Sequence, residues 1–453
     1  GRKVFARIVD HELSQISKNR EQAYEKILDT AQKYMDEFDL GINWEYLRRV
    51  TLNQGYTLNT YINSMADQLH PNVLKTTLLN LGYEAFYNGT RTIREMRKIH
   101  NCNIPWIILM DPISACNLHC TGCWAAEYGN KLNLTFDEMD SVITQGIELG
   151  IYFYMLTGVE PLVRKKDVIA LCKKHNDCIF LAYTNGTLVD EELCRQMQEA
   201  GNLFLALSLE GKPEVNDLRR GEGVYGKVMH AMELLKENGL VFGTSICYTS
   251  QNIESVTSDE FIQMLVEKGC RYSLYFHYMP VGNEASPELL PTVEQRTYMH
   301  HRVWEIRNME HGPGLFTMDF QNDGEFVGGC IAGGRNYFHI NANGDAEPCV
   351  FIHYSNGNIR ENTILEILKQ PLFMAYHNNQ PFNDNMLRPC PMLENPEILQ
   401  KLVKESGAHS TDLQSPETPE HLCGKCVAYA EKWAPEAERL WKETQEKKAS
   451  RSF

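Results

Sequence analysis

The chain lacks several features that mark whole classes of protein. None of its apolar runs reaches the roughly 18 residues that indicate a transmembrane helix, and residues 1–7 contain no apolar stretch of the kind that signal peptides carry. Positive charge is scarce, because 44 Lys and Arg face 59 Asp and Glu, for a formal net charge of −15. That balance disfavours non-specific binding to nucleic acid. We therefore expect a cytoplasmic protein with no transmembrane segment.

Cysteine, by contrast, is plentiful, with 14 residues in a chain of 453. The cysteines are spread along the whole chain, whereas a small secreted disulfide scaffold concentrates them. Five lie in apolar helix or strand patterns and are expected to be core thiols: Cys172, Cys178, Cys194, Cys247 and Cys270. Eight others lie in loop-like contexts near Gly or Pro, which core packing does not explain.

The hydrophobic pattern divides the chain into three regions, for which we predict domain boundaries at 1–104, 105–311 and 312–453. The first region is helical, with apolar residues at helical spacing at 12–38 and 71–100 and an interruption near Asn88–Gly89. The last combines short strands, many glycines and five cysteines, which predicts a small α+β domain.

In the middle region apolar runs alternate with amphipathic segments. We predict strands at 106–110, 151–156, 179–183, 203–209, 241–248 and 272–278. The helices are expected from Thr135, where Thr-Phe-Asp-Glu forms a capping box, and at 163–175, 191–200, 224–238, 258–268 and 293–309. Six βα units imply a parallel sheet but are too few to close an eight-stranded barrel. The expected α/β fold is therefore a partial (β/α)6 TIM-like barrel with ligands at the carboxyl ends of its strands.

Cys116, Cys120 and Cys123 form a Cys-x3-Cys-x2-Cys motif directly after the first predicted strand. Three thiolates this close can bind three irons of a [4Fe–4S] cluster and leave the fourth iron open to a non-protein ligand. A structural zinc site usually takes four protein ligands in paired short spacings, although His119 lies inside this motif. The spacing therefore favours an iron–sulfur site over zinc.

With this motif at the end of the first strand, residues 105–310 resemble the radical S-adenosylmethionine (SAM) superfamily. Thr157–Pro161, at the end of the second strand, resembles the Gly-Gly-Glu-Pro motif of that family, with Val159 in place of the second glycine. The family usually has an aromatic residue before the third cysteine, where this chain has Gly122, and Trp124 follows the cysteine instead.

The resemblance implies roles for residues at the ends of the second, third, fourth and sixth strands. Gly158, Glu160 and Pro161 would bind the methionine amino group, and Asn185, in Thr184-Asn185-Gly186, either contacts the ligand or simply makes a turn. Ser208 and Glu210 would bind the ribose. Arg219 or Arg220 would bind the methionine carboxylate, and the segment containing Met279 (278–282) would pack on adenine.

The C-terminal cysteines resemble a second family feature. Cys330 and Cys349 flank a hairpin turn signal at Asn341–Asp345, as in the SPASM/twitch extensions that bind auxiliary iron–sulfur clusters. The dense cysteine run of a full SPASM pattern is missing, since only Cys390 and the Cys423/Cys426 pair follow. One auxiliary [4Fe–4S] cluster is therefore expected, with Cys426 favoured over Cys423 as its fourth ligand; a four-thiolate zinc site is the alternative.

The resemblance implies an oxygen-sensitive enzyme that reductively cleaves SAM at the [4Fe–4S] cluster and abstracts a substrate hydrogen through a 5′-deoxyadenosyl radical. The electron would come from a partner such as flavodoxin or ferredoxin. Many members with such extensions modify a peptide or protein, which is the first expectation for the substrate. A lipid or other small molecule is the alternative, because the helical cap carries residues that could cover an apolar chain: Leu74, Leu78, Leu79, Leu81, Tyr83 and Phe86. A non-catalytic zinc or iron–sulfur scaffold or regulator is the other reading that the residues leave open.

Overall fold

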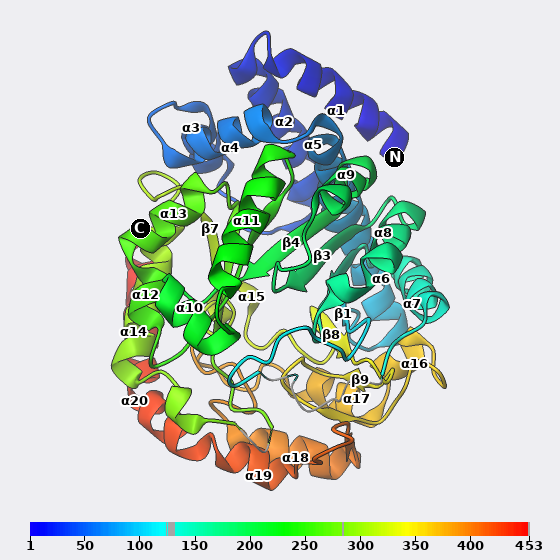
Figure 1. The fold of residues 1–453 in the computed structure, drawn as a ribbon, viewed down its shortest axis with the longest axis vertical. Coiled ribbons are helices and arrows are strands. Elements are labelled where there is room, and N and C mark those ends of the chain that lie inside the picture. The colour runs from blue at the N-terminus through cyan, green and yellow to red at the C-terminus, as the bar shows by residue number, and fades with distance from the viewer. Residues whose placement is uncertain (124, 126–131, 283–284, 452–453) are drawn as a thin grey trace.

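The computed structural model describes residues 1–123, 125, 132–282 and 285–451. Trp124, named above for its place after the third cysteine, lies outside the described residues. In Figure 1 the N-terminal helices (blue) lie at one end of a central sheet and the C-terminal helices (orange and red) at the other. No helix in the described ranges is long and apolar enough to cross a membrane.

The first hundred residues are helical, as expected. Their elements are α1 (Arg2–Ile16), α2 (Arg20–Met35), η1 (Asp36–Phe38), α3 (Trp44–Leu52), α4 (Thr57–Gln68), α5 (Pro71–Thr77), η2 (Leu78–Gly89, a π-helix) and α6 (Thr90–His100). The expected interruption at Asn88–Gly89 is wrong, since the backbone stays helical from η2 into α6. Gly89 instead permits close packing, because a Cβ there would lie 2.5 Å from the Gly150 carbonyl oxygen.

All six predicted strands are present, and neighbours pair in parallel. They are β1 (Ile107–Met110), β2 (Phe153–Leu156), β3 (Ile179–Thr184), β4 (Leu203–Ser208), β5 (Phe242–Tyr248) and β6 (Tyr272–His277). The helical elements of this region are α7 (Phe136–Glu148), η3 (Pro161–Arg164), α8 (Lys165–Lys174), α9 (Glu191–Ala200), α10 (Pro213–Arg220), α11 (Val224–Glu237), α12 (Ile253–Thr257), α13 (Asp259–Glu267), η4 (Pro287–Leu289) and α14 (Val293–Ile306). Thr135 caps α7 through the expected capping box with Glu138. The partial-barrel fold is thus confirmed.

The sheet continues beyond these six strands at both edges. Its order in the described residues is β7-β6-β5-β4-β3-β2-β1-β8-β9, in which β7 (Phe316–Asp319) and β8 (Tyr337–Ile340) are parallel to their barrel neighbours. β9 (Ala346–Glu347) forms an antiparallel hairpin with β8. Two strands from beyond residue 312 therefore pair with the strands at the two edges of the barrel, β7 with β6 and β8 with β1.

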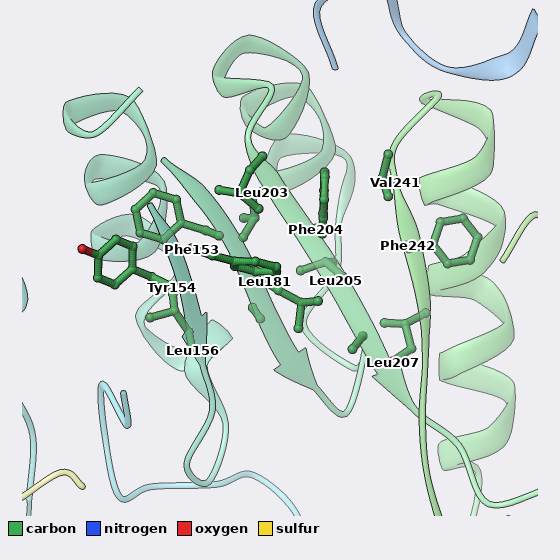
Figure 2. Packing of buried hydrophobic residues seen from close by; sticks show 14 of the residues in the cluster. Phe153, Tyr154, Leu156, Leu181, Leu203, Phe204, Leu205, Leu207, Val241 and Phe242 are labelled. Atoms are coloured by element: carbon green, nitrogen blue, oxygen red, sulfur yellow. The ribbon is translucent and has the colours of Figure 1, made fainter. Parts of the chain in front are cut away.

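Strand alternation gives the barrel two faces. On β4, Phe204 and Ser208 face an internal cavity, whereas Leu205 and Leu207, between them in sequence, are fully buried outside it. On β5 the same alternation separates Ser245 from Phe242. Figure 2 shows Phe242 pointing towards a neighbouring helix, within the packed layer that surrounds the strands. The core therefore lies mainly between the sheet and its helices, and the concave side is open enough to hold a ligand.

The C-terminal region packs a second apolar cluster below the barrel. It contains α15 (Gly324–Val327), β10 (Tyr354–Ser355), α16 (Ile364–Leu368), α17 (Pro371–Asn379), α18 (Pro396–Ser406), β11 (His409–Ser410), α19 (Pro419–Gly424) and α20 (Val427–Arg451). Trp433 of α20 is fully buried in this cluster, together with Cys423 and Cys426. The predicted core role of four other cysteines is confirmed, since Cys172, Cys178, Cys194 and Cys270 are buried in the barrel core. Cys247 differs: it is half-buried and faces the cavity.

Candidate functional site

The three-cysteine loop lies at the carboxyl end of β1. Cys116, Cys120 and Cys123 are half-buried and line one wall of the cavity. The Leu118 amide donates a hydrogen bond to Cys116 Sγ at 3.3 Å. Burial raises the pKa of Cys116, which that amide opposes, and also raises the pKa of Cys120, which Arg220 opposes. The loop thus presents three thiols with a nearby amide and guanidinium that favour the thiolate form, which is the form that binds metal.

The loop is held by the residues that follow β4. The Thr121 amide donates to the Arg219 carbonyl at 2.9 Å, and Arg219 Nε donates to the Thr121 carbonyl at 3.1 Å. Arg220 Nη1 lies 3.9 Å from Cys120 Sγ. Backbone and side chain of two neighbouring arginines therefore position the loop directly.

Both arginines share one carboxylate. Glu210 is fully buried, and its Oε1 lies 2.7 Å from Arg219 Nη1 and 2.5 Å from Arg220 Nη2. Glu210 does not line the cavity, whereas Arg219 and Arg220 do. Burial alone would lower the pKa of Arg219, but Glu210 outweighs it and the pKa is raised. In this conformation Glu210 holds the two guanidinium groups in place. It does not face the cavity, as direct binding of a ribose would require.

Glu160 also acts inside the protein. It is fully buried and accepts hydrogen bonds from Thr184 Oγ1 (2.7 Å), the Asn185 amide (2.8 Å) and the Leu162 amide (3.0 Å). Burial raises the pKa of Glu160, although these donors oppose the shift. Glu160 itself does not line the cavity. Its carboxylate fastens the ends of β2 and β3 together, next to Gly158, which does line the cavity.

Asn185 connects this strand end to the cysteine loop. Its Nδ2 donates to Asn117 Oδ1 at 2.8 Å and lies 3.8 Å from Cys116 Sγ. Gly158, on the other side, has φ +88°, and a Cβ there would lie 2.8 Å from the Asp111 carboxyl group. The Gly158 backbone thus approaches β1 as only glycine allows, while Pro161 is buried in the first turn of η3.

Tyr278 occupies the space beside Gly122. A Cβ on Gly122, which has φ +68°, would lie 3.3 Å from the Tyr278 ring. The Tyr278 hydroxyl accepts a hydrogen bond from the Ser286 amide at 3.0 Å. Met279 and Ser208 line the same cavity. An aromatic ring from the end of β6 therefore lies where the loop itself carries no side chain.

The cavity has a volume of about 840 Å³ and runs through the barrel from the cysteine loop to the N-terminal helices. That volume lies in the range of small-molecule sites. Its wall is mainly apolar and includes residues that the sequence pattern marked only as strand: Phe153, Leu181, Tyr183, Phe204, Val241 and Phe276. Their period of two was the available signal, but it does not say which side of a barrel is left open.

The C-terminal cysteines gather in the second apolar cluster. Cys330, Cys349, Cys390 and the Cys423/Cys426 pair all belong to it or pack against it. The amides of Met392 and Leu393 donate to Cys390 Sγ at 3.4 and 3.3 Å, and the Tyr337 hydroxyl lies 2.7 Å from Cys349 Sγ. Burial raises the pKa of Cys330 to about 12 and that of Cys349 to about 11.

No three His, Cys, Asp or Glu side chains of the described residues surround a point where a single metal ion would bind. The cysteine groups nevertheless suit a cluster, because each iron of a [4Fe–4S] cube takes its own thiolate. Amide donors to sulfur, as at Cys116 and Cys390, are contacts that tune such clusters.

A buried charged group joins the two cysteine regions. His339 of β8 contacts Asp111 Oδ1 through Nε2 (2.8 Å) and Glu347 Oε2 through Nδ1 (2.6 Å), and all three residues are buried. Burial would lower the pKa of His339, but the two carboxylates outweigh it and raise the pKa to about 10. Asp111 lies between β1 and the cysteine loop, and Glu347 lies two residues before Cys349. The sequence pattern gave no sign of this group.

Comparison with known proteins identifies the class. Residues 110–265 match the family model of the radical SAM superfamily, and residues 330–392 match that of the iron–sulfur cluster-binding domain named SPASM. The chain is therefore a radical SAM enzyme with a SPASM domain. The first domain implies a [4Fe–4S] cluster and SAM, and the second implies further iron–sulfur clusters.

Similar proteins differ in what their names say they make. An AdoMet-dependent heme synthase of Methanosarcina barkeri is 26% identical over 58% of this chain and 82% of its own length. PqqA peptide cyclase of Granulibacter bethesdensis is 25% identical over 65% and 81%. The crystal structure of SuiB from Streptococcus suis with SAM superposes with a TM-score of 0.54 at 17% identity, covering 67% of this chain and 76% of SuiB, which supports the fold.

Proposed function

We propose that Cys116, Cys120 and Cys123 hold the catalytic [4Fe–4S] cluster and that SAM binds between this loop and the ends of β2 to β6. When bound and reduced, the cluster and SAM supply the radical chemistry that removes hydrogen from a substrate C–H bond. The thiol donor set, the loop position and the opening of all three thiols onto one cavity support the assignment. The chain's own task is to fix the loop and to exclude water from an apolar chamber.

For SAM, we propose that Gly158, Asn185, Ser208 and Met279 contact the ligand, since all four line the cavity beside the cysteines. Of the two arginines, we assign the methionine carboxylate to Arg219 or Arg220 as a fork-to-carboxylate pair. We propose that Glu160, Pro161 and Glu210 position these groups from behind. Their burial and their hydrogen bonds to strand ends support that role.

We propose one auxiliary [4Fe–4S] cluster, held by Cys330, Cys349, Cys390 and either Cys423 or Cys426. Four to five thiols in one apolar cluster, with amide donors to the Cys390 sulfur and a hydroxyl in contact with the Cys349 sulfur, support this number. Tyr337 faces both the cavity and Cys349. That arrangement supports an auxiliary site directly behind one wall of the substrate chamber.

For the substrate, we propose a small molecule with a large apolar part. The carrying observation is the cavity, which continues from the cysteine loop through the barrel among inward-facing apolar side chains. Of the cap residues that the sequence singled out, Leu74, Leu78 and Leu81 line it. An apolar ligand gains about 25 cal/mol for each Å² of apolar surface that it buries there.

A peptide substrate is the second candidate, because PqqA peptide cyclase and the mycofactocin maturase MftC are among the similar proteins. A peptide would enter at the exposed side of the cysteine loop, where His119 and Thr121 are exposed. It would leave most of the inner cavity unfilled, which is why the small molecule is preferred.

The test is anaerobic reconstitution followed by measurement of iron, sulfide and 5′-deoxyadenosine after reduction with dithionite. We expect about eight irons per chain and SAM cleavage in the wild type. Cys120→Ala should lose about four irons and all cleavage, whereas Cys349→Ala should lose about four irons and keep some cleavage. Cys194→Ala, at a buried cysteine of α9 that belongs neither to the cavity wall nor to the second apolar cluster, is the matched control. Full iron content and normal cleavage in Cys120→Ala would refute the assignment.

A further inference from the structure

The inner end of the cavity is closed by the N-terminal helices. Residues of α4, α5 and η2, together with Leu69 between α4 and α5, line it there: Tyr61, Met65, Leu69, Leu74, Thr77, Leu78 and Leu81. The closure is anchored by polar contacts at the amino ends of the strands, such as Asn80 Nδ2 to the Cys178 carbonyl at 2.9 Å. In a parallel barrel this end is opposite the cysteine loop, about 20 Å away over a six-residue strand.

One charged side chain, Arg271, lines this inner end. Arg271 directly precedes β6 and is 8% exposed. Its Nη1 donates to Ser64 Oγ at 2.6 Å and its Nη2 to Gln68 Oε1 at 2.8 Å, so α4 holds the guanidinium from one side. Its Nε is buried without a hydrogen-bond acceptor in the described residues. Burial lowers the pKa of Arg271.

No carboxylate of the described residues forms an ion pair with Arg271, in contrast to Arg296, whose fully buried guanidinium pairs with Glu394 at 2.7 Å. Arg97 and Arg335 also lack a carboxylate partner there, but their guanidinium groups donate to backbone carbonyls and neither lines the cavity. Arg271 therefore combines two properties that these arginines do not: a buried positive charge without a counter-charge, and a place on the cavity wall.

The rest of the described cavity wall supplies no negative charge to compensate Arg271. Its described lining contains no Asp or Glu, and its only other fully charged residues, Arg219 and Arg220, lie at the opposite end. Burying a cation in apolar surroundings is costly unless an anion or several acceptors compensate it. Arg has five N–H donors, of which two are used by Ser64 and Gln68. The remaining donors suit an anionic oxygen group on a ligand.

We propose that the substrate is an amphipathic carboxylate, with its carboxylate bound by Arg271 at the inner end and its apolar body lying along the barrel towards the cysteine loop. This assignment rests on the proposed function and narrows its substrate class. The anion compensates a buried charge on the cavity wall for which the described residues supply no counter-charge, while the apolar strand residues cover the chain. The carbon that loses hydrogen is then one far from the carboxylate, since the cysteines lie at the other end.

The test is equilibrium binding to the anaerobic holoenzyme, measured by isothermal titration with palmitate, hexadecanol and dodecyl phosphate. Palmitate should bind about 10- to 100-fold more tightly than hexadecanol, because a charge-assisted hydrogen bond separates them. Arg271→Gln should remove that preference and leave hexadecanol binding unchanged, and Arg271→Lys should keep part of it. Arg335→Gln, at a half-buried arginine outside the cavity, should keep all of it. If the affinity for dodecyl phosphate, corrected for its shorter chain, equalled that for palmitate, any anionic head group would suffice. That result would overturn the carboxylate assignment.

Equal affinity of the wild type for palmitate and hexadecanol would overturn the proposal, and this comparison needs no variant to fold. Loss of both affinities in Arg271→Gln with an unchanged melting temperature would also contradict it, because the residue would then only shape the cavity. SAM cleavage by dithionite-reduced enzyme is measured in parallel. Cleavage without a carboxylate preference refutes this inference alone, whereas a carboxylate preference without cleavage refutes the proposed function and leaves the anion site standing.

Discussion

The buried Glu210 offers the sharpest test of how the chain holds its cysteine loop. Glu210→Gln keeps the size of the side chain and one carbonyl oxygen but removes the charge that Arg219 and Arg220 share. The two guanidinium groups would then lie side by side beneath Cys120 without their carboxylate. Arg219 also accepts a hydrogen bond from the Thr121 amide and donates one to the Thr121 carbonyl. A shift of either arginine therefore moves the loop.

The magnitude follows from burial. Removing one partner of a buried ion pair costs about 3–5 kcal/mol, but the arginine side chains are 16% and 13% exposed, and glutamine retains an acceptor. We therefore expect a loss of about 2–4 kcal/mol in the free energy of unfolding. SAM affinity should fall at least tenfold, because the arginine that binds its carboxylate loses its position.

Denaturant unfolding under anaerobic conditions measures the stability, and equilibrium dialysis with labelled SAM measures the affinity. Glu214→Gln, at an exposed acid on α10, the helix that carries Arg219 and Arg220, is the matched control and should change neither. If Glu210→Gln unfolds within about 0.5 kcal/mol of the wild type and binds SAM normally, the positioning role assigned to Glu210 is wrong.

Three further predictions concern other contacts. Gly122→Ala should weaken SAM binding more than Gly223→Ala does, because both glycines have positive φ but only a Cβ at Gly122 meets Tyr278; equal effects in dialysis would contradict the role of that contact. His339 has a pKa raised to about 10, so the stability from its charge is fully present below about pH 6.5 and is lost as pH rises towards 10. Thermal melts should show this loss in the wild type and a flatter profile in His339→Gln. Tyr337→Phe removes the hydroxyl 2.7 Å from Cys349 Sγ, and the potential of the auxiliary cluster should become more negative in an EPR-monitored titration, with no shift in the control Tyr354→Phe.

Local sequence patterns determined most of the barrel. Each of the six predicted strands is within two residues of the observed one, and the helix predicted at 191–200 is α9 itself. These elements follow from hydrophobic period, caps and glycines, which are properties of neighbouring residues. The strand β8 was missed as part of the barrel because its pairing with β1 joins residues more than 200 positions apart. The helix break predicted at Gly89 is wrong for the same reason. A glycine is needed there because the backbone packs against the distant Gly150.

The site shows the same division. The sequence by itself determined the class of chemistry, because three cysteines within eight residues are held together by the chain whatever surrounds them. Only the tertiary structure decided which groups face a ligand. Glu160 and Glu210 are buried and hold neighbouring groups in place, whereas Cys247 lines the cavity. Arg271 lies at the inner end of the cavity, with no carboxylate partner in the part of the chain that the structure describes. Burial and charge compensation depend on what packs against a residue in space, and no local pattern records that.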